Sequence, residues 1–509
     1  MQLRSFKKRV VLWLQLALAA TALAQTVPTT GTPSALPPIA ETHITPQQAK
    51  ELFRSVDDIM RFASQDSKLI IHHEVKRRLT TRDAVEKFLE LKFNEDESAK
   101  RLQRSEIVLK KFGLLDRDFQ LGPFLLSLLR EQIAGFYDNK TKTINLLDYL
   151  PPDAQKPVLA HELTHALQDQ HIDLTKWQNQ SPNTIAKNVK EDNQHIERDE
   201  DDTARDAVLE GQAMVVFFDY ALRASGKTLQ EMPESLPKIE DSMGDSSDSP
   251  ILARAPLVLK ESLIFPYREG VGFVGTILAK SGPAAAFAGT LDRPPSSSFE
   301  ILHPDAYLEH VKVPVLQLPD LHPLLDADYN PYDVGVMGEV DVRMLAELFA
   351  GPEIAKQLSS SWRGGIYYAA QRKSAITPAA KASTASLGLA YLSRWATPAA
   401  ANKFATMYAA QFARKYQHVT RDIEAATGDA EQIYKTEEGP AIVLVAGNSV
   451  LTLEGFELPL ARKLELSILA SEPNSELRVA ATAAPPELTG NLRALFLHPG
   501  VMLRGALTR

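Results

Sequence analysis

The sequence predicts an α+β fold, with a mainly helical N-terminal region that carries a small β-hairpin and an α+β C-terminal region. Three observations lead to this expectation. Apolar residues recur at helical spacing over most of the first 310 residues. Two short apolar runs flank an Asp/Asn turn near residue 140. Beyond residue 315, Ala-rich helical stretches alternate with strand-like runs.

The composition excludes some classes of partner. Hydrophobic residues make up 44% and charged residues 24% of the 509 residues, which are ordinary values for a globular protein. The net charge of −8 provides no basic surface, so we expect no nucleic-acid partner. There is no cysteine, and a chain of this length can bury a large core without disulfides.

The first residues are typical of a secretory signal peptide. An apolar run over residues 10–24 ends in Ala22-Leu23-Ala24, a cleavage site before Gln25. The run is short for a membrane span, and polar, Pro- and Thr-rich sequence follows it. We therefore expect residues 1–24 to be removed and residues 25–45 to form a flexible linker. The mature protein should be periplasmic or secreted, without a membrane span. The basic residues before the run are Arg4, Lys7, Lys8 and Arg9.

The next elements follow from periodicity and turn residues. Amphipathic runs predict a helical region from Thr45-Pro46 to about residue 130. Apolar runs at residues 132–137 and 143–147 predict a β-hairpin, because an Asp/Asn turn separates them. Asp153 is the expected N-cap of the helix that follows.

Polar stretches and helices then alternate. The acidic stretch 175–202 and the Pro/Ser/Asp-rich stretch 232–250 are predicted to be loops, with a helix over residues 204–222 between them. In the C-terminal region, helices are expected at residues 344–348 and 399–415. Strand-like runs occupy residues 387–392 and 441–445.

The segment His161-Glu162-Leu163-Thr164-His165 is an HExxH motif within an apolar run. Residues four apart lie on one face of a helix, so both imidazoles can hold one metal ion. Glu162 is rotated by about 100° from His161 and can reach a water at the metal as a general base. The motif therefore predicts a metal-dependent hydrolase.

A catalytic zinc site needs a third protein ligand, with one position left for water. Glu210 is the preferred candidate, because none of its neighbours on the same helix face is a Lys or Arg that could pair with it. A carboxylate on an apolar face is costly unless a charge compensates it, and a metal ion would do so. The neighbours are Asp206, Ala207, Ala213 and Met214.

His171 is the alternative third ligand. It follows His161 by the spacing of the metzincin pattern, which has a glycine where this chain has Gln168. A continuous helix would carry His171 about 15 Å along the axis from His161, out of ligand range. In that case His171 can instead donate a hydrogen bond near the cleft.

The segment from His161 to Asp169 resembles the active-site helix of thermolysin-type gluzincin peptidases. The resemblance implies zinc as the cofactor, His161, His165 and Glu210 as ligands, and Glu162 as the base. Those enzymes have an aspartate four residues after the ligand glutamate, where this chain has Met214. Asp169 and Asp206 are therefore the alternative partners for a ligand histidine.

A wider resemblance covers most of the chain. It is similar to a group of exported bacterial HExxH proteins described as metallopeptidases. It implies a zinc metallopeptidase, which we expect to form a zincin-like domain at residues 46–313. The change in sequence pattern beyond residue 315 predicts an α+β domain of unknown role at 314–470 and a loosely ordered tail at 471–509. The segments that carry the resemblance are Gly135-Phe136-Tyr137-Asp138, residues 161–171, Glu210-Gly211, Phe265-Pro266-Tyr267 with Gly270, and Ile301-Leu302-His303-Pro304.

The chemistry expected of such a site is hydrolysis of a peptide or protein substrate. The oxyanion needs a donor besides the metal, and Tyr267, His303 and His171 are candidates. The predicted hairpin is placed to pair with an extended substrate. Two alternatives stay open: a degenerate zinc protein that recognises a partner without cutting it, and a zinc hydrolase of non-peptide amides.

Gly270, Gly272 and Gly275 spell GxGxxG, with Asp292 about 20 residues on. No clear strand precedes them, as a dinucleotide-binding turn requires. We interpret these glycines as helix-packing positions.

Overall fold

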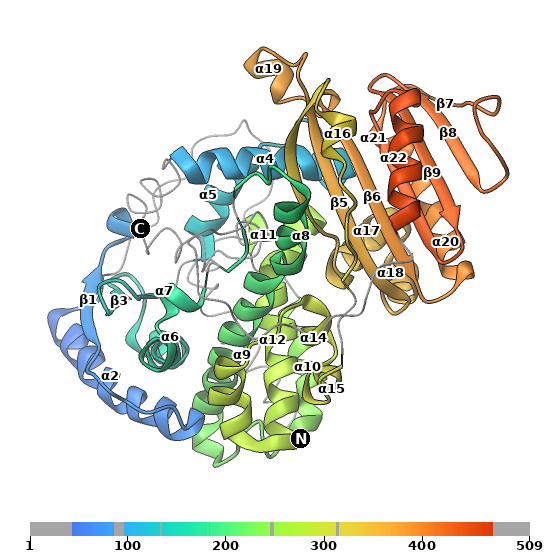
Figure 1. The fold of residues 1–509 in the computed structure, drawn as a ribbon. Coiled ribbons are helices and arrows are strands. Elements are labelled where there is room, and N and C mark those ends of the chain that lie inside the picture. Colours follow the sequence, from blue (N-terminus) through green and yellow to red (C-terminus); the bar gives the residue numbers. More distant parts are fainter. Residues whose placement is uncertain are drawn as a thin grey trace, which may run out of the picture.

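A computed structural model describes residues 43–85, 96–132, 135–178, 180–182, 184–244, 249–311 and 315–471. It has the mixed α+β class that the sequence predicts. Helices and a small three-stranded sheet form one part, and a seven-stranded sheet with its own helices forms the other (Figure 1). The signal peptide, almost all of the linker and the tail beyond residue 471 lie outside the described residues.

The first part contains most of the helices. They are α2 (Pro46–Ser67), α4 (Asp96–Phe112), α5 (Leu121–Gln132), α6 (Pro152–Ile172), α7 (Leu174–Trp177), α8 (Val189–Arg198), α9 (Asp201–Leu222), α10 (Leu236–Met243), α11 (Pro250–Ala253), α12 (Leu257–Ala284), the π-helical η4 (Ala285–Gly289), α13 (Thr290–Asp292), α14 (Ser298–Leu302) and α15 (Pro304–Leu308). The short 3₁₀ turns η2 (Arg223–Ser225) and η3 (Pro233–Ser235) lie between α9 and α10.

The second part contains the large sheet. Its strands are β4 (Tyr329–Val336), β5 (Trp362–Arg372), β6 (Leu387–Trp395), β7 (Val419–Arg421), β8 (Glu431–Thr436), β9 (Gly439–Ala446) and β10 (Ser449–Glu454). Its helices are α16 (His322–Leu325), α17 (Glu339–Ala350), α18 (Pro352–Ser359), α19 (Pro378–Lys381), the 3₁₀ turn η5 (Thr384–Ser386), α20 (Pro398–Ala410), α21 (Phe412–Lys415) and α22 (Leu458–Ser471).

Helix α2 begins where the sequence predicts. The Thr45 hydroxyl accepts the Gln48 N–H at 3.2 Å, and the Gln48 side chain accepts the Thr45 N–H at 2.8 Å. This reciprocal capping box satisfies two backbone donors that the helix itself cannot pair. The predicted helical region to about residue 130 contains α2, α4 and α5, but β1 (Lys76–Thr80), which was not predicted, interrupts it. Since β1 is polar and pairs in parallel with a distant strand, its own residues gave little strand signal.

The predicted hairpin is confirmed. Strands β2 (Phe136–Asp138) and β3 (Thr143–Leu147) are antiparallel, and the order β1-β3-β2 leaves β2 at one edge of the small sheet. Helix α6 follows with Pro151 as its N-cap. The prediction that Asp153 caps it is wrong, since Asp153 lies in the first turn and pairs with Lys156.

Helices α9 and α12 cross at glycines. A Cβ built on Gly211 would overlap the carbonyl group of Gly270, and one on Gly270 would overlap the carbonyl oxygen of Ala207. Side chains on Gly272 and Gly275 would collide with Glu240 and Leu236 of α10. All three glycines of the GxGxxG stretch lie inside α12, so they are helix-packing positions.

The acidic stretch before α9 is not a solvated loop. It contains α8, and Asp199, Glu200 and Asp202 near its end are buried. The Asp199 carboxylate accepts the Val336 N–H at 2.7 Å, and Ser298 Oγ donates to Glu200. These partners come from distant segments, so local charge density could not reveal them. The predicted loop at 232–250 likewise contains α10.

The seven strands follow the order β4-β5-β6-β10-β9-β8-β7, with antiparallel neighbours throughout. Alternate side chains along β9 face opposite layers: Val443 belongs to a cluster with Phe404 of α20, and Ile442 to a cluster with Leu464 of α22. Figure 1 shows α22 lying along one face of the sheet. The predicted strands at 387–392 and 441–445 and the helices at 344–348 and 399–415 fall within observed elements, the last being split into α20 and α21.

The helical stretch Leu257–Asp292, which is kinked at Gly282, has the length and apolar composition of a membrane span, the one such stretch in the described part of the chain. Half of its most apolar window is buried inside the protein. The core helix of a soluble protein has the same properties, so a protein without a membrane span stays a prediction.

Candidate metal centre

The two histidines of the HExxH segment lie in the interior of α6, one turn apart on the same face. His165 is fully buried, and His161 is 9% exposed. Their Nε2 atoms lie 3.1 Å apart, with the two rings nearly perpendicular at 85°. The helical spacing of the motif therefore aims both nitrogens at one point.

Glu210 of α9 completes the group. Its Oε2 lies 3.0 Å from Nε2 of His161 and 3.4 Å from Nε2 of His165, and the residue is 1% exposed. Helix α9 packs along α6, and the glycine contact next to Glu210 holds α9 against α12. Within the described residues, His161, His165 and Glu210 are the one group of three or more such side chains arranged to bind a metal ion.

The three donor atoms fit a small tetrahedral cation. Zinc bonds of 2.0–2.2 Å at tetrahedral angles would place the donors about 3.3 Å apart, close to the 3.0, 3.1 and 3.4 Å seen here. Two imidazole nitrogens and one carboxylate oxygen also match the His₂Glu set of catalytic zinc sites. A buried carboxylate facing two nitrogens gains charge compensation from a bound cation.

Glu162 faces the small sheet with one of its carboxylate oxygens. Its Oε2 accepts the backbone N–H of Tyr137 at 2.9 Å, and Tyr137 belongs to the edge strand β2. The Tyr137 hydroxyl donates to Asp169 of α6 at 2.7 Å. Burial, together with this carboxylate, raises the pKa of Tyr137 well above its usual range. Tyr137 therefore fastens β2 to α6 at two points.

His165 has a hydrogen-bond partner that the sequence did not suggest. Its Nδ1 lies 2.7 Å from Oε1 of Gln168, one turn further along α6. Asp169 instead accepts hydrogen bonds from Tyr137 and Lys142, and Asp206 accepts from Gln178. The carboxylates that the sequence offered are used to fasten neighbouring elements.

The three predicted oxyanion donors, Tyr267, His303 and His171, have different surroundings. The ring of Tyr267 on α12 stacks beside that of His161, with centroids 6.2 Å apart and planes 18° apart. His303, between α14 and α15, has Nε2 2.8 Å from a Glu339 oxygen. His171, in the last turn of α6, has Nε2 2.9 Å from Asp292. Of the three, Tyr267 has a ring contact with a residue of the metal-binding group.

Sequence reasoning missed Gln168 and Gln212, which form a buried amide chain behind His165. The available signal was weak. Each is a polar residue within an apolar helix, two or three positions after a ligand candidate.

Comparisons with protein-family models, with curated proteins and with solved structures find no match for this chain.

Proposed function

We propose that this chain is an exported zinc-dependent metallohydrolase, a peptidase of the gluzincin type. The observation that carries the proposal is the convergence of His161, His165 and Glu210 on one point, with Glu162 one residue after the first ligand. A purely structural zinc site fills all four positions with protein ligands and needs no base. Three donors and an adjacent carboxylate favour hydrolysis.

Zinc held there would polarise a substrate carbonyl and lower the pKa of a bound water toward about 7. Glu162 accepts the proton of the attacking water. The Tyr137 N–H holds one oxygen of its carboxylate at 2.9 Å, which leaves the other oxygen to take the proton. Tyr267, beside His161, is better placed than His303 to donate a hydrogen bond to the developing oxyanion, because His303 is engaged with Glu339.

An extended peptide is the favoured substrate. Strand β2 lies at the edge of its sheet, and its backbone already contacts the proposed base. A peptide that adds to this edge as a further strand would lie with its backbone carbonyl groups near Glu162. An open sheet edge presents unpaired backbone groups that another chain can pair with.

The test compares Glu162→Gln with the unmodified protein, using an unfolded protein as substrate and metal analysis of each preparation. We expect hydrolysis to fall by roughly 10²- to 10⁴-fold with zinc content unchanged, because the change removes a base and no ligand. Asp153→Asn, at an exposed carboxylate of the same helix, is the matched control and should remain active. Equal activity in Glu162→Gln and the unmodified protein would refute the proposed base. An unmodified protein that binds no zinc would refute the whole proposal.

A further inference from the structure

We propose that Gln168 and Gln212 act as positioning residues, an amide relay that fixes the tautomer of His165 for metal binding. The inference rests on the metal-binding part of the proposed function. It concerns a chain of hydrogen bonds that runs from the π-helical turn η4 through α9 to α6.

The relay begins at η4, where the direction of the Gln212 amide is set. Its Nε2 lies 3.1 Å from the carbonyl oxygen of Ala286, 2.9 Å from that of Phe287 and 2.8 Å from Oγ1 of Thr290. Carbonyl oxygens only accept hydrogen bonds, so the nitrogen end of this amide must face the turn. The Thr290 hydroxyl donates to the Ala286 carbonyl at 2.8 Å and can accept from Gln212.

The oxygen end of Gln212 therefore points back toward α6 and sets the second amide. Gln168 Nε2 donates to Gln212 Oε1 at 2.9 Å and to the Leu209 carbonyl oxygen at 3.0 Å. Both of these partners are acceptors, so the nitrogen of Gln168 faces α9 and its oxygen faces His165.

Gln168 Oε1 lies 2.7 Å from Nδ1 of His165. Because an amide oxygen has no proton to give, Nδ1 must be the protonated nitrogen of this ring. The neutral imidazole then has its lone pair on Nε2, the atom that faces His161 and Glu210. This is the tautomer that a metal ion requires, and outer-shell hydrogen bonds of this kind commonly set it.

Burial makes the relay rigid. His165, Gln168 and Gln212 are each 0% exposed, so water does not compete for their hydrogen bonds. A carboxylate could serve His165 equally well as an acceptor, but it would add a second buried negative charge beside Glu210. An amide supplies the acceptor without that charge, and its direction is fixed by carbonyl groups of two other helical segments.

The test measures zinc affinity by competition with a chromophoric chelator, so it does not depend on catalysis. Gln168→Met keeps the length of the side chain and removes its polar atoms. We expect its zinc dissociation constant to rise by roughly 10- to 100-fold, as for other outer-shell partners of metal ligands. Gln212→Met should produce a smaller rise, because Gln168 keeps its bond to the Leu209 carbonyl. Nitrogen NMR of the metal-free protein should find His165 protonated at Nδ1, with a mixture of tautomers in Gln168→Met.

The matched control is Gln155→Met. Gln155 lies on α6, is 2% exposed and bonds only to backbone groups of Leu147 and Leu150. It should lose stability but keep zinc affinity. Equal affinities for Gln168→Met and Gln155→Met would overturn the relay and leave metal binding intact, whereas failure of the unmodified protein to bind zinc would overturn both. If Gln168→Met does not fold, Gln212→Met decides, and unchanged zinc affinity with unchanged His165 tautomer in that variant would overturn the relay.

Discussion

At the scale of single residues, the two imidazoles of the HExxH segment have different surroundings. His165 is sealed behind Gln168, whereas His161 keeps 9% of its surface and stacks beside Tyr267. The solvent-facing side of the group is therefore the side of His161. Under the proposed function, a water or a substrate carbonyl would reach the group from there, close to Tyr267.

Replacement of Glu210 tests whether this residue, and not His171, is the third metal ligand. Glu210→Gln keeps the shape of the side chain but removes its charge, so zinc loses its one anionic donor. We expect the zinc dissociation constant to rise by more than the roughly 10- to 100-fold typical of an outer-shell change. His171→Ala is the control and should bind zinc as the unmodified protein does, because His171 is occupied by Asp292. Loss of zinc in His171→Ala, with zinc retained in Glu210→Gln, would reverse the assignment.

Kinetic measurements can decide whether Tyr267 or His303 donates a hydrogen bond to the oxyanion. Tyr267→Phe keeps the ring that stacks beside His161 and removes the hydroxyl. If this hydroxyl donates to the oxyanion, kcat should fall by roughly 10²- to 10³-fold at unchanged zinc content. His303→Gln should leave kcat close to that of the unmodified protein, since His303 pairs with Glu339. The opposite pattern would transfer the role to His303.

The three proposed metal ligands were predictable from single residues, but the hydrogen bonds that orient His165 were not. Spacing placed His161 and His165 on one helix face, and the absence of a cationic neighbour pointed to Glu210. The role of Gln168 could not be predicted, because an amide can face either way. Its direction is set by Gln212 and by carbonyl groups that the fold brings from other helices.

At the scale of elements, the site depends on where α9 and α12 cross. Gly211 follows the proposed ligand Glu210, and Gly270 lies one turn after Tyr267. The two helix backbones touch there, which only glycine allows. One crossing therefore positions a ligand and the proposed oxyanion donor together.

Gly211→Ala tests this crossing. The added methyl group would overlap the Gly270 carbonyl group, so the helices must separate. We expect a loss of roughly 1–3 kcal/mol or more in the free energy of unfolding, with weaker zinc binding because Glu210 moves with α9. Chemical denaturation and chelator competition measure the two effects. Gly428→Ala is the control, because a Cβ there meets nothing within 4 Å. Unchanged stability and zinc affinity in Gly211→Ala would show that the crossing has no such role.

Elements with strong periodicity or a distinct turn were predictable, as α2, the β2–β3 hairpin and β9 show. Strand β1 was not, because its partner β3 is distant in sequence and its own residues are polar. Asp199 and Glu200 lie in a run of charged residues that is typical of a solvated loop, but both carboxylates are buried. Their hydrogen-bond donors come from residues about 100 or more positions later in the chain.

At the scale of the whole molecule, several buried carboxyl groups link stability to pH. Burial, with the nearby charge of Asp206, raises the pKa of Asp202 to about 7. Burial likewise raises the pKa of Asp333 to about 7. A carboxyl whose pKa is raised by folding stabilises the folded state only while it is protonated. This contribution is fully present below the unfolded pKa near 4 and is lost as pH rises through about 7.

Asp202→Asn tests this linkage. An amide oxygen can still accept the Gln180 N–H that Asp202 Oδ1 accepts at 2.6 Å, and no charge remains to be buried. We expect similar stability to the unmodified protein near pH 4 and greater stability at pH 8. The difference should be on the order of 4 kcal/mol, because each pKa unit corresponds to about 1.4 kcal/mol. Denaturant unfolding across this pH range measures it, with Asp153→Asn as an exposed control. A parallel shift at all pH values would contradict the proposed titration.

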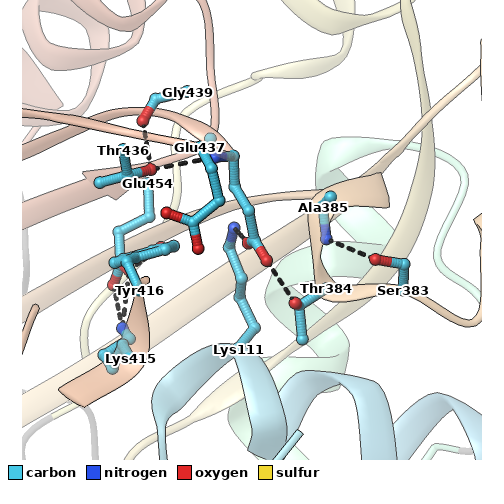
Figure 2. A network of polar contacts seen from close by, with 12 residues as sticks. Lys111, Ser383, Thr384, Ala385, Lys415, Tyr416, Thr436, Glu437, Gly439 and Glu454 are labelled. Atoms are coloured by element: carbon cyan, nitrogen blue, oxygen red, sulfur yellow. Dashed lines mark hydrogen bonds and ion pairs between the residues drawn. The ribbon is translucent and has the colours of Figure 1, made fainter. Parts of the chain in front are cut away.

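The two parts of the molecule are also joined by buried charges. Lys111 of α4 lies 2.8 Å from Glu438 in the turn after β8, and the side chains are 1% and 2% exposed. Thr384 Oγ1 donates to the same carboxylate at 2.6 Å. Figure 2 shows this network beside a second one, in which Lys415 contacts both oxygens of Glu454 at 2.6 Å. Because one hydrophobic cluster also includes residues of both parts, polar and apolar contacts connect them together.

Lys111→Met tests how strongly this pair connects the two parts. The variant leaves Glu438 buried without the ammonium group that, against the effect of burial, holds its pKa below the usual value. Breaking a buried pair so that one charge is left uncompensated removes roughly 3–5 kcal/mol of stability. Because Arg117 still pairs with Glu438, we expect a smaller loss than this in denaturant unfolding. Lys111→Met combined with Glu438→Gln should recover part of it, because no buried carboxylate remains. Lys156→Met, which breaks an exposed ion pair within α6 to Asp153, is the control and should lose roughly 0.5 kcal/mol. If Lys111→Met and Lys156→Met lose the same stability, the buried pair does not hold the helices to the sheet, and the shared hydrophobic cluster alone joins them.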